Sequence, residues 1–282
     1  MAAIAAVLIP LTLFTVMLAL GLGLPVDAFR QWRRHWPLLL RVELATCLLV
    51  PLAAWLLLSL PPARVLSVEV RHGIALMAAC PSAPLILRKA GKSGGNVAVA
   101  GLLQVAAAGL AIVTVPLLAQ LGERVFAVEG WDVLPRQVAL QVGQVQLLPL
   151  LAGLLLRHRF PGTTARLQLP LDRLANGLLA VLVLAVLVKT LPLLVPFGLA
   201  NLPALPLMVL LVLLSLAFGY AAAGEGRERR ITAAAVTSMR NPGLALLLAS
   251  TYAPQIPAVK LAILLYLLIT VLVSAPLLRR MR

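Results

Sequence analysis

The chain has 282 residues, of which 62% are hydrophobic and 12% charged, and its net charge is +15. A water-soluble fold of this composition would have too few polar side chains to cover its surface, so a soluble globular class is excluded. The cations are scattered in small groups between apolar runs, which argues against a nucleic-acid-binding protein. We therefore expect an integral membrane protein.

Apolar runs long enough to cross a hydrocarbon core of about 30 Å follow one another along the chain. In chain order they predict nine transmembrane helices, at 2–24, 36–59, 68–90, 95–121, 136–156, 172–195, 203–223, 230–252 and 256–278. The first run is too long for a signal peptide and lacks its basic start, so we expect it to stay as a span. The expected fold class is all-α, a single transmembrane domain over 1–282 with halves at about 1–121 and 136–282.

Lys and Arg residues indicate the orientation, because short cytoplasmic loops collect them. Seventeen lie in the alternate set of loops that ends at the C-terminus, and five lie in the other set. We expect a multi-pass protein of the cell inner membrane or plasma membrane, with the C-terminus cytoplasmic and the N-terminus outside. Its expected partner is the lipid bilayer and not nucleic acid; the sequence predicts no oligomeric state.

The third and eighth expected spans contain helix-breaking residues near their middle. These are Pro81 and Pro84 in the third span and Pro242 and Gly243 in the eighth. Proline removes an amide donor, and non-helical backbone is tolerated at membrane depth only inside the protein or beside a water-filled cavity. Two interrupted spans, one in each half, indicate a transporter built from inverted repeats with its substrate near the membrane midplane. The alternative is that these prolines only kink ordinary helices.

Arg240 is the cation expected to lie deepest in a span. An Arg at that depth costs about 2.5–3.5 kcal/mol on insertion scales, so it needs a cavity, a partner or a ligand. It is a candidate for holding an anionic substrate. The alternative is a structural pairing with a backbone carbonyl or with a carboxylate such as Glu43. Lys189 lies near the outer end of its span, where a lysine normally reaches the interface.

A further polar feature is a series of glutamines at helical spacing, Gln137, Gln141 and Gln144, together with Gln104 on the preceding span. This stripe either lines a cavity or forms hydrogen bonds between helices. Cys47 and Cys80 lie inside apolar stretches, where a thiol behaves as a small buried hydrophobe. The sequence contains no zinc, phosphate-loop or dinucleotide-binding motif, so we expect no catalytic residues and no enzyme.

Five segments, taken in order, resemble the bile acid:sodium symporter family over nearly the whole chain. They are 17–22 with 27–30 (MLALGL and DAFR), 50–57 (VPLAAWLL), 80–81 with 95–98 (CP and GNVA), 147–149 (LLP) and 239–245 (MRNPGLA). The resemblance implies a nine-helix form with a panel domain and a core domain. In the core, two broken helices would cross beside the substrate and two sodium sites. It also implies transport of bile acids or other organic anions with the sodium gradient.

The residues at the family's ion-ligand positions differ in this chain. They are Ile86 and Leu87 after the first break, Ala100 and Gln104 on the next span, Val236 and Arg240 in the eighth span, and Thr46 in the second. Sodium prefers several oxygen ligands, usually with a carboxylate. We therefore expect no cofactor, no metal site and no sodium coupling, and predict a uniporter, an exchanger or a proton-coupled carrier.

These observations predict a secondary transporter of a small organic anion. The expected substrate-binding residues are Arg240, Asn241, Ser82, Arg88, Gln104 and Met239. Arg88 alternatively belongs, with Lys89 and Lys92, to a cytoplasmic charge group. One alternative function is a carrier of the same fold for another solute such as arsenite, for which Cys80 is suitably placed. Another is a membrane sensor that keeps the fold without transporting.

Overall fold

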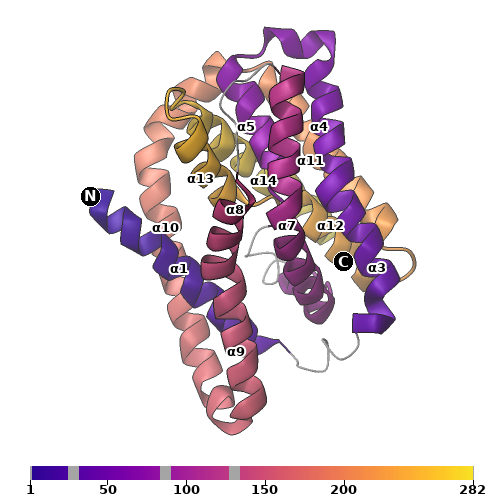
Figure 1. The fold of residues 1–282 in the computed structure, drawn as a ribbon, viewed down its shortest axis with the longest axis vertical. Helices are drawn as coiled ribbons and strands as arrows, with labels where there is room; N and C mark the ends of the chain where they lie inside the picture. Colours follow the sequence, from indigo (N-terminus) through magenta and orange to yellow (C-terminus); the bar gives the residue numbers. More distant parts are fainter. Residues whose placement is uncertain (1, 25–31, 83–89, 127–133, 282) are drawn as a thin grey trace.

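The computed structural model describes residues 2–24, 32–82, 90–126 and 134–281, and the regular elements in these ranges are all helices (Figure 1). The helices are α1 (Ala2–Gly23), α3 (Trp32–Leu44), α4 (Val50–Ser59), α5 (Val68–Ala79), α7 (Val97–Phe126), α8 (Pro135–Val142), α9 (Leu148–Arg159), α10 (Pro161–Ala200), α11 (Ala204–Ala222), α12 (Arg227–Ser238), α13 (Pro242–Tyr252) and α14 (Val259–Arg280). Short π-helical segments, Ala45–Leu49 and Gly143–Leu147, join α3 to α4 and α8 to α9. The chain is all-α, as its composition predicts.

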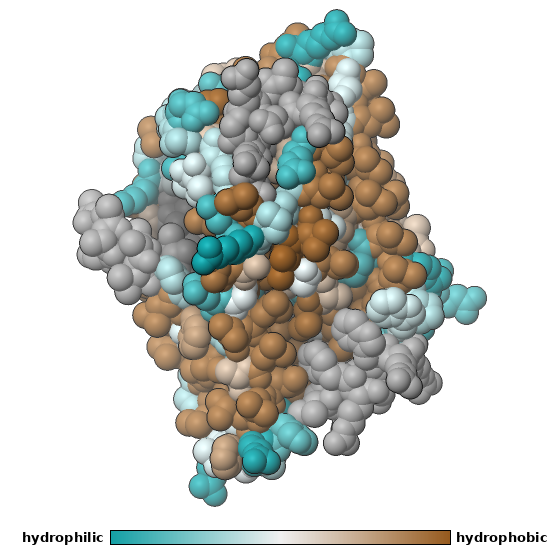
Figure 2. Space-filling model, viewed as in Figure 1, coloured by the Kyte–Doolittle hydropathy of each residue, from teal (hydrophilic) through white to brown (hydrophobic). Residues whose placement is uncertain are grey.

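Five of the described helical segments are long and apolar enough to cross a bilayer. They are His35–Ser59, Val97–Leu121, Pro135–Arg159, Ala204–Ala222 and Val259–Arg280, and each coincides with one of the nine expected spans. Apolar side chains cover a large part of the face seen in Figure 2. Leucines such as Leu56, 65% exposed, would be costly in water. This outer surface therefore faces lipid.

Two of the other four expected spans fall on α1 and α10, in which shorter apolar segments, Pro10–Gly23 and Val188–Ala200, are found among the described residues. The expected spans leave 157–171 as a loop, but α9 continues to Arg159 and α10 already begins at Pro161. Proline suits the first position of a helix, and the Leu, Arg and Gln residues that follow are good helix formers. The remaining two expected spans are interrupted.

Helices α1, α9 and α10 pack against one another as one group, on the left in Figure 1. Gly21 of α1 and Gly153 of α9 lie where these two helices cross. A Cβ atom at Gly21 would meet the carbonyl oxygen of Leu150, and one at Gly153 would meet that of Leu18. Small residues thus bring two helix backbones together, as is typical inside membranes.

The two interrupted helices, α5 and α12, lie among the remaining helices. Helix α5 packs against α4, α13 and α14, and α12 packs against α7, α11 and α14. Both helices end inside the protein, and Arg240, just beyond the end of α12, is the largest of the fully buried side chains. The interior of this group is therefore where the chain places its buried charge.

Candidate functional site

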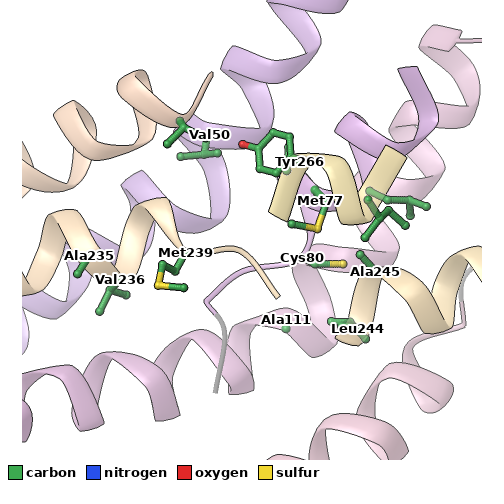
Figure 3. Packing of buried hydrophobic residues seen from close by; sticks show 14 of the residues in the cluster. Val50, Met77, Cys80, Ala111, Ala235, Val236, Met239, Leu244, Ala245 and Tyr266 are labelled. Carbon is green, nitrogen blue, oxygen red and sulfur yellow. The ribbon is translucent and has the colours of Figure 1, made fainter. Parts of the chain in front are cut away.

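The breaks after α5 and α12 have the same backbone conformation. Cys80 has φ −87° and ψ 102°, and Met239 has φ −87° and ψ 99°. The two breaks lie side by side (Figure 3), and the amide of Asn241 donates to the carbonyl of Cys80 at 3.2 Å. We call this point, where Cys80 and residues 239–241 meet, the crossing. Because this amide is used across the crossing, the carbonyl of Thr237 lacks the N–H that a continuing helix would supply.

Another carbonyl without a helical donor lies in the π-helical segment Ala45–Leu49. The amide of Val50 donates to Ala45 with the longer spacing of a π-helix. The next residue, Pro51, has no N–H to give to Thr46. The proline therefore explains why the carbonyl of Thr46 is left over in the middle of an apolar helix.

Two more carbonyls without a helical donor lie at the C-terminal end of α5. The helical donor for Met77 would be the amide of residue 81, which is a proline. The donor for Ala78 would be Ser82, whose φ of 26° lies outside the helical range. Both oxygens are buried, and leaving a buried carbonyl unpaired costs about 1–3 kcal/mol.

The guanidinium of Arg240 binds all four of these oxygens. Its Nε donates to Met77 at 3.2 Å, and its Nη2 donates to Ala78. Its Nη1 donates to Thr46 at 2.9 Å and to Thr237 at 3.5 Å. Arg240 is 1% exposed, and no carboxylate of the described residues is among its hydrogen-bond partners. This arrangement matches the alternative that the sequence left open, in which Arg240 pairs with backbone carbonyls.

Threonine and asparagine side chains complete the crossing. The hydroxyls of Thr46 and Thr237 lie 3.0 Å apart, and Thr46 also donates to Val42. The side-chain oxygen of Asn241 accepts from the amide of Leu244 at 3.1 Å, which caps the start of α13. The sequence indicated Thr46 only as a substituted ion position, and it gave no signal for Thr237.

The other expected substrate residues lie nearby or outside the described part. Ser82 donates to the side-chain oxygen of Gln104 at 2.7 Å, which joins the first break to α7. Met239 is buried at the second break. Pro81 and Ser82 are buried beyond the end of α5, whereas Pro84, Ile86, Leu87 and Arg88 lie outside the described residues. Pro242 and Gly243 form the first turn of α13.

The glutamines of the expected stripe differ in their exposure. Gln137 and Gln144 are exposed, and Gln137 accepts a hydrogen bond from Tyr252. The side chain of Gln141 lies outside the described part. Gln146, which is off the stripe, is buried. The bonds of Gln137 to Tyr252 and of Gln104 to Ser82 fit the alternative in which these glutamines form hydrogen bonds between helical segments.

Among the described residues, those at the family's ion-ligand positions do not fit a sodium site. Ala100 and Val236 are buried hydrocarbon side chains, and Gln104 is bonded to Ser82. Carbonyl oxygens that a cation could use are present, but the guanidinium of Arg240 already binds them. A second cation among these oxygens would be repelled by the first.

The sequence model of the sodium bile acid symporter family matches residues 10–196. The chain belongs to this family. The match covers about two thirds of the chain and includes the first break; the second break lies beyond it. Members are membrane transporters, so the protein is a sodium-symporter-like, multi-pass membrane transporter. A comparison with curated proteins gives no match.

Proposed function

We propose that the protein is a secondary transporter of a small organic anion that binds where the two breaks cross. The observation that carries this proposal is the buried charge of Arg240. Its four hydrogen bonds go to carbonyls, which leave its net charge uncancelled. A charge in a low-dielectric interior acts strongly on an incoming anion.

Arg240 also keeps a donor for direct contact. A guanidinium has five N–H groups, and the described hydrogen bonds use four of them. We propose that the remaining N–H on Nη2 binds the anionic group. Around it, Asn241, Ser82, Gln104, Met239 and Arg88 would line the substrate site, and the paired breaks would belong to inverted repeats.

We further propose nine spans with a cytoplasmic C-terminus. Arg227 of α12 donates to the carbonyl of Met281 at 2.8 Å. Arg41 of α3 lies against the loop at Gly224. These contacts gather cations of separate loops at the end that holds the C-terminus. Ser67 and Asn201, from the opposite set of loops, are hydrogen bonded to each other. The pattern supports the orientation expected from the loop charges.

Sodium independence is the third part of the proposal. The guanidinium binds the carbonyls on which a coupling cation would depend, and the side-chain oxygens of Thr46, Asn241 and Gln104 are already used in hydrogen bonds within the protein. Arg240 would supply permanently the positive charge that a bound cation supplies reversibly.

Uptake into proteoliposomes tests this function. The purified protein should accumulate or exchange a labelled anion from a panel that includes taurocholate and succinate, at equal initial rates in sodium and choline buffers. Empty liposomes give the background. A sodium-dependent increase of tenfold, equivalent to about 1.4 kcal/mol of coupling, would contradict sodium independence. Binding without any flux across the panel would favour the sensor alternative.

A further inference from the structure

Glu43 is a carboxyl group inside the membrane that the crossing does not use. It lies in α3, eight residues into the span His35–Ser59, or about 12 Å from that end of the helix. Its side chain is 4% exposed. The thiol of Cys47 donates to its Oε2 at 3.6 Å, and its Oε1 has no hydrogen-bond partner among the described residues.

Few charged groups face this carboxyl. Among the described side chains of α3 and the π-helical segment that follows, the titratable group bonded to it is the thiol of Cys47, whereas Arg41 is exposed and donates to Pro37. From the break after α12 the charge of Arg240 acts on it, and Arg240 donates to the carbonyl of Thr46, three residues beyond Glu43. Helix α11 contains no acidic or basic residue, and those of α7 stand at its far end. Glu43 therefore experiences one nearby positive charge.

Two opposing effects set its protonation. An isolated carboxylate in the membrane interior lacks solvation, which favours the neutral acid. The field of Arg240 favours the carboxylate. A second anion near Arg240 would cancel that field and add a like charge, so the acid would then be favoured. The occupancy of the crossing thus shifts the pH at which Glu43 releases its proton.

We propose that Glu43 is a proton-binding site coupled to anion binding at the crossing. This rests on the proposed function. At a pH where Glu43 is ionised in the empty protein, the carboxylate takes one proton from the buffer when the anion arrives and becomes a neutral acid; when the anion leaves, the acid returns the proton to the buffer. No other bond changes. Linkage is reciprocal, so a proton at Glu43 tightens anion binding as much as the anion tightens proton binding.

The first test needs no substrate. Infrared difference spectra of the purified protein in lipid nanodiscs are recorded between pH 5 and 10. We expect a C=O band of a protonated carboxylic acid that disappears as pH rises. The band should be lost in Glu43→Gln and kept in Glu228→Gln, a control at an exposed glutamate. If Glu43→Gln does not fold, Glu43→Asp replaces it and should shift the band.

The second test uses taurocholate, whose sulfonate stays ionised across this range. Calorimetry in two buffers of different ionisation enthalpy should detect up to one proton taken up for each anion bound. Above the titration of Glu43 the affinity should fall by up to about tenfold for each pH unit. In Glu43→Gln, which is always neutral, the affinity should stay at the low-pH value of the unmodified protein.

The two proposals fail differently. A spectrum without a titrating band, or a band that Glu43→Gln leaves unchanged, overturns the proton site. Anion binding with no proton uptake overturns the coupling. A titrating band in a protein that neither binds nor transports any anion of the panel overturns the proposed function and leaves the proton site standing.

Discussion

The side chain of Arg240 replaces backbone amides that are missing at the crossing. Pro51 and Pro81 remove two donors, and Asn241, at the end of the second break, uses another amide across the crossing. One planar group with donors on three nitrogens can reach carbonyls on separate elements, which a lysine ammonium cannot match. A charge that is expensive in lipid is thereby solvated by the protein itself.

Removing this group should be costly. Arg240→Gln leaves at least two buried carbonyls without a donor, at about 1–3 kcal/mol each, so we expect a loss of about 3 kcal/mol or more in stability. Arg240→Lys should keep part of the stability that Arg240→Gln loses. Thermal unfolding of the detergent-purified variants measures the effect, and Arg229→Gln, at an exposed position, is the control. Equal melting temperatures for Arg240→Gln and the control would contradict the structural role.

The folded fraction of the same variant tests the substrate role separately. If the charge of Arg240 attracts the anion, taurocholate should bind to Arg240→Gln about tenfold more weakly or worse, because a charge-assisted hydrogen bond is worth about 1.5–3 kcal/mol. Unchanged affinity would remove Arg240 from the substrate site and leave its contacts with the four carbonyls.

At the scale of whole helices, close packing depends on glycine where α1 and α9 cross. Gly153→Ala should destabilise the protein by about 1–3 kcal/mol, because the added carbon meets the backbone of Leu18, which cannot move aside as a side chain can. Gly177→Ala is the matched control, since nothing lies within 4 Å of its Cβ position in α10. There alanine should be neutral or stabilising by up to about 1 kcal/mol. Similar melting temperatures for both variants would show that the two helices separate easily.

The helices themselves could be predicted from sequence to different degrees. Apolar length located five spans well, because hydropathy alone decides whether a helix suits a bilayer. The start of α10 was missed, since polar residues that form helices well give no hydropathy signal. The π-helical segment before Pro51 was also missed, although a proline inside an apolar run does signal a carbonyl without its donor.

For the molecule as a whole, the sequence placed an arginine at a break but could not show what it binds. The four carbonyls belong to three segments that are distant along the chain, and only the fold brings them together. Proline positions predict which carbonyls lose their donors, whereas the packing of α5, α12 and the segment at Thr46 decides that one guanidinium reaches them all. The loss of donors could be predicted from the proline positions, whereas the meeting of four carbonyls at one guanidinium could not.

The orientation of the molecule gives the last prediction. Cations from separate loops gather with the C-terminus at one end, so this end should face the cytoplasm, where short loops retain Lys and Arg. A fluorescent protein that folds only in the cytoplasm should fluoresce when fused after Arg282. Alkaline phosphatase, active only after export, should be active when fused after Asn201, whose contact with Ser67 marks the opposite end. With an odd number of spans, a tag at the N-terminus should react with reagents applied outside the cell. Phosphatase activity after Arg282 would reverse the orientation, and equal labelling of both termini from one side would rule out an odd number of spans.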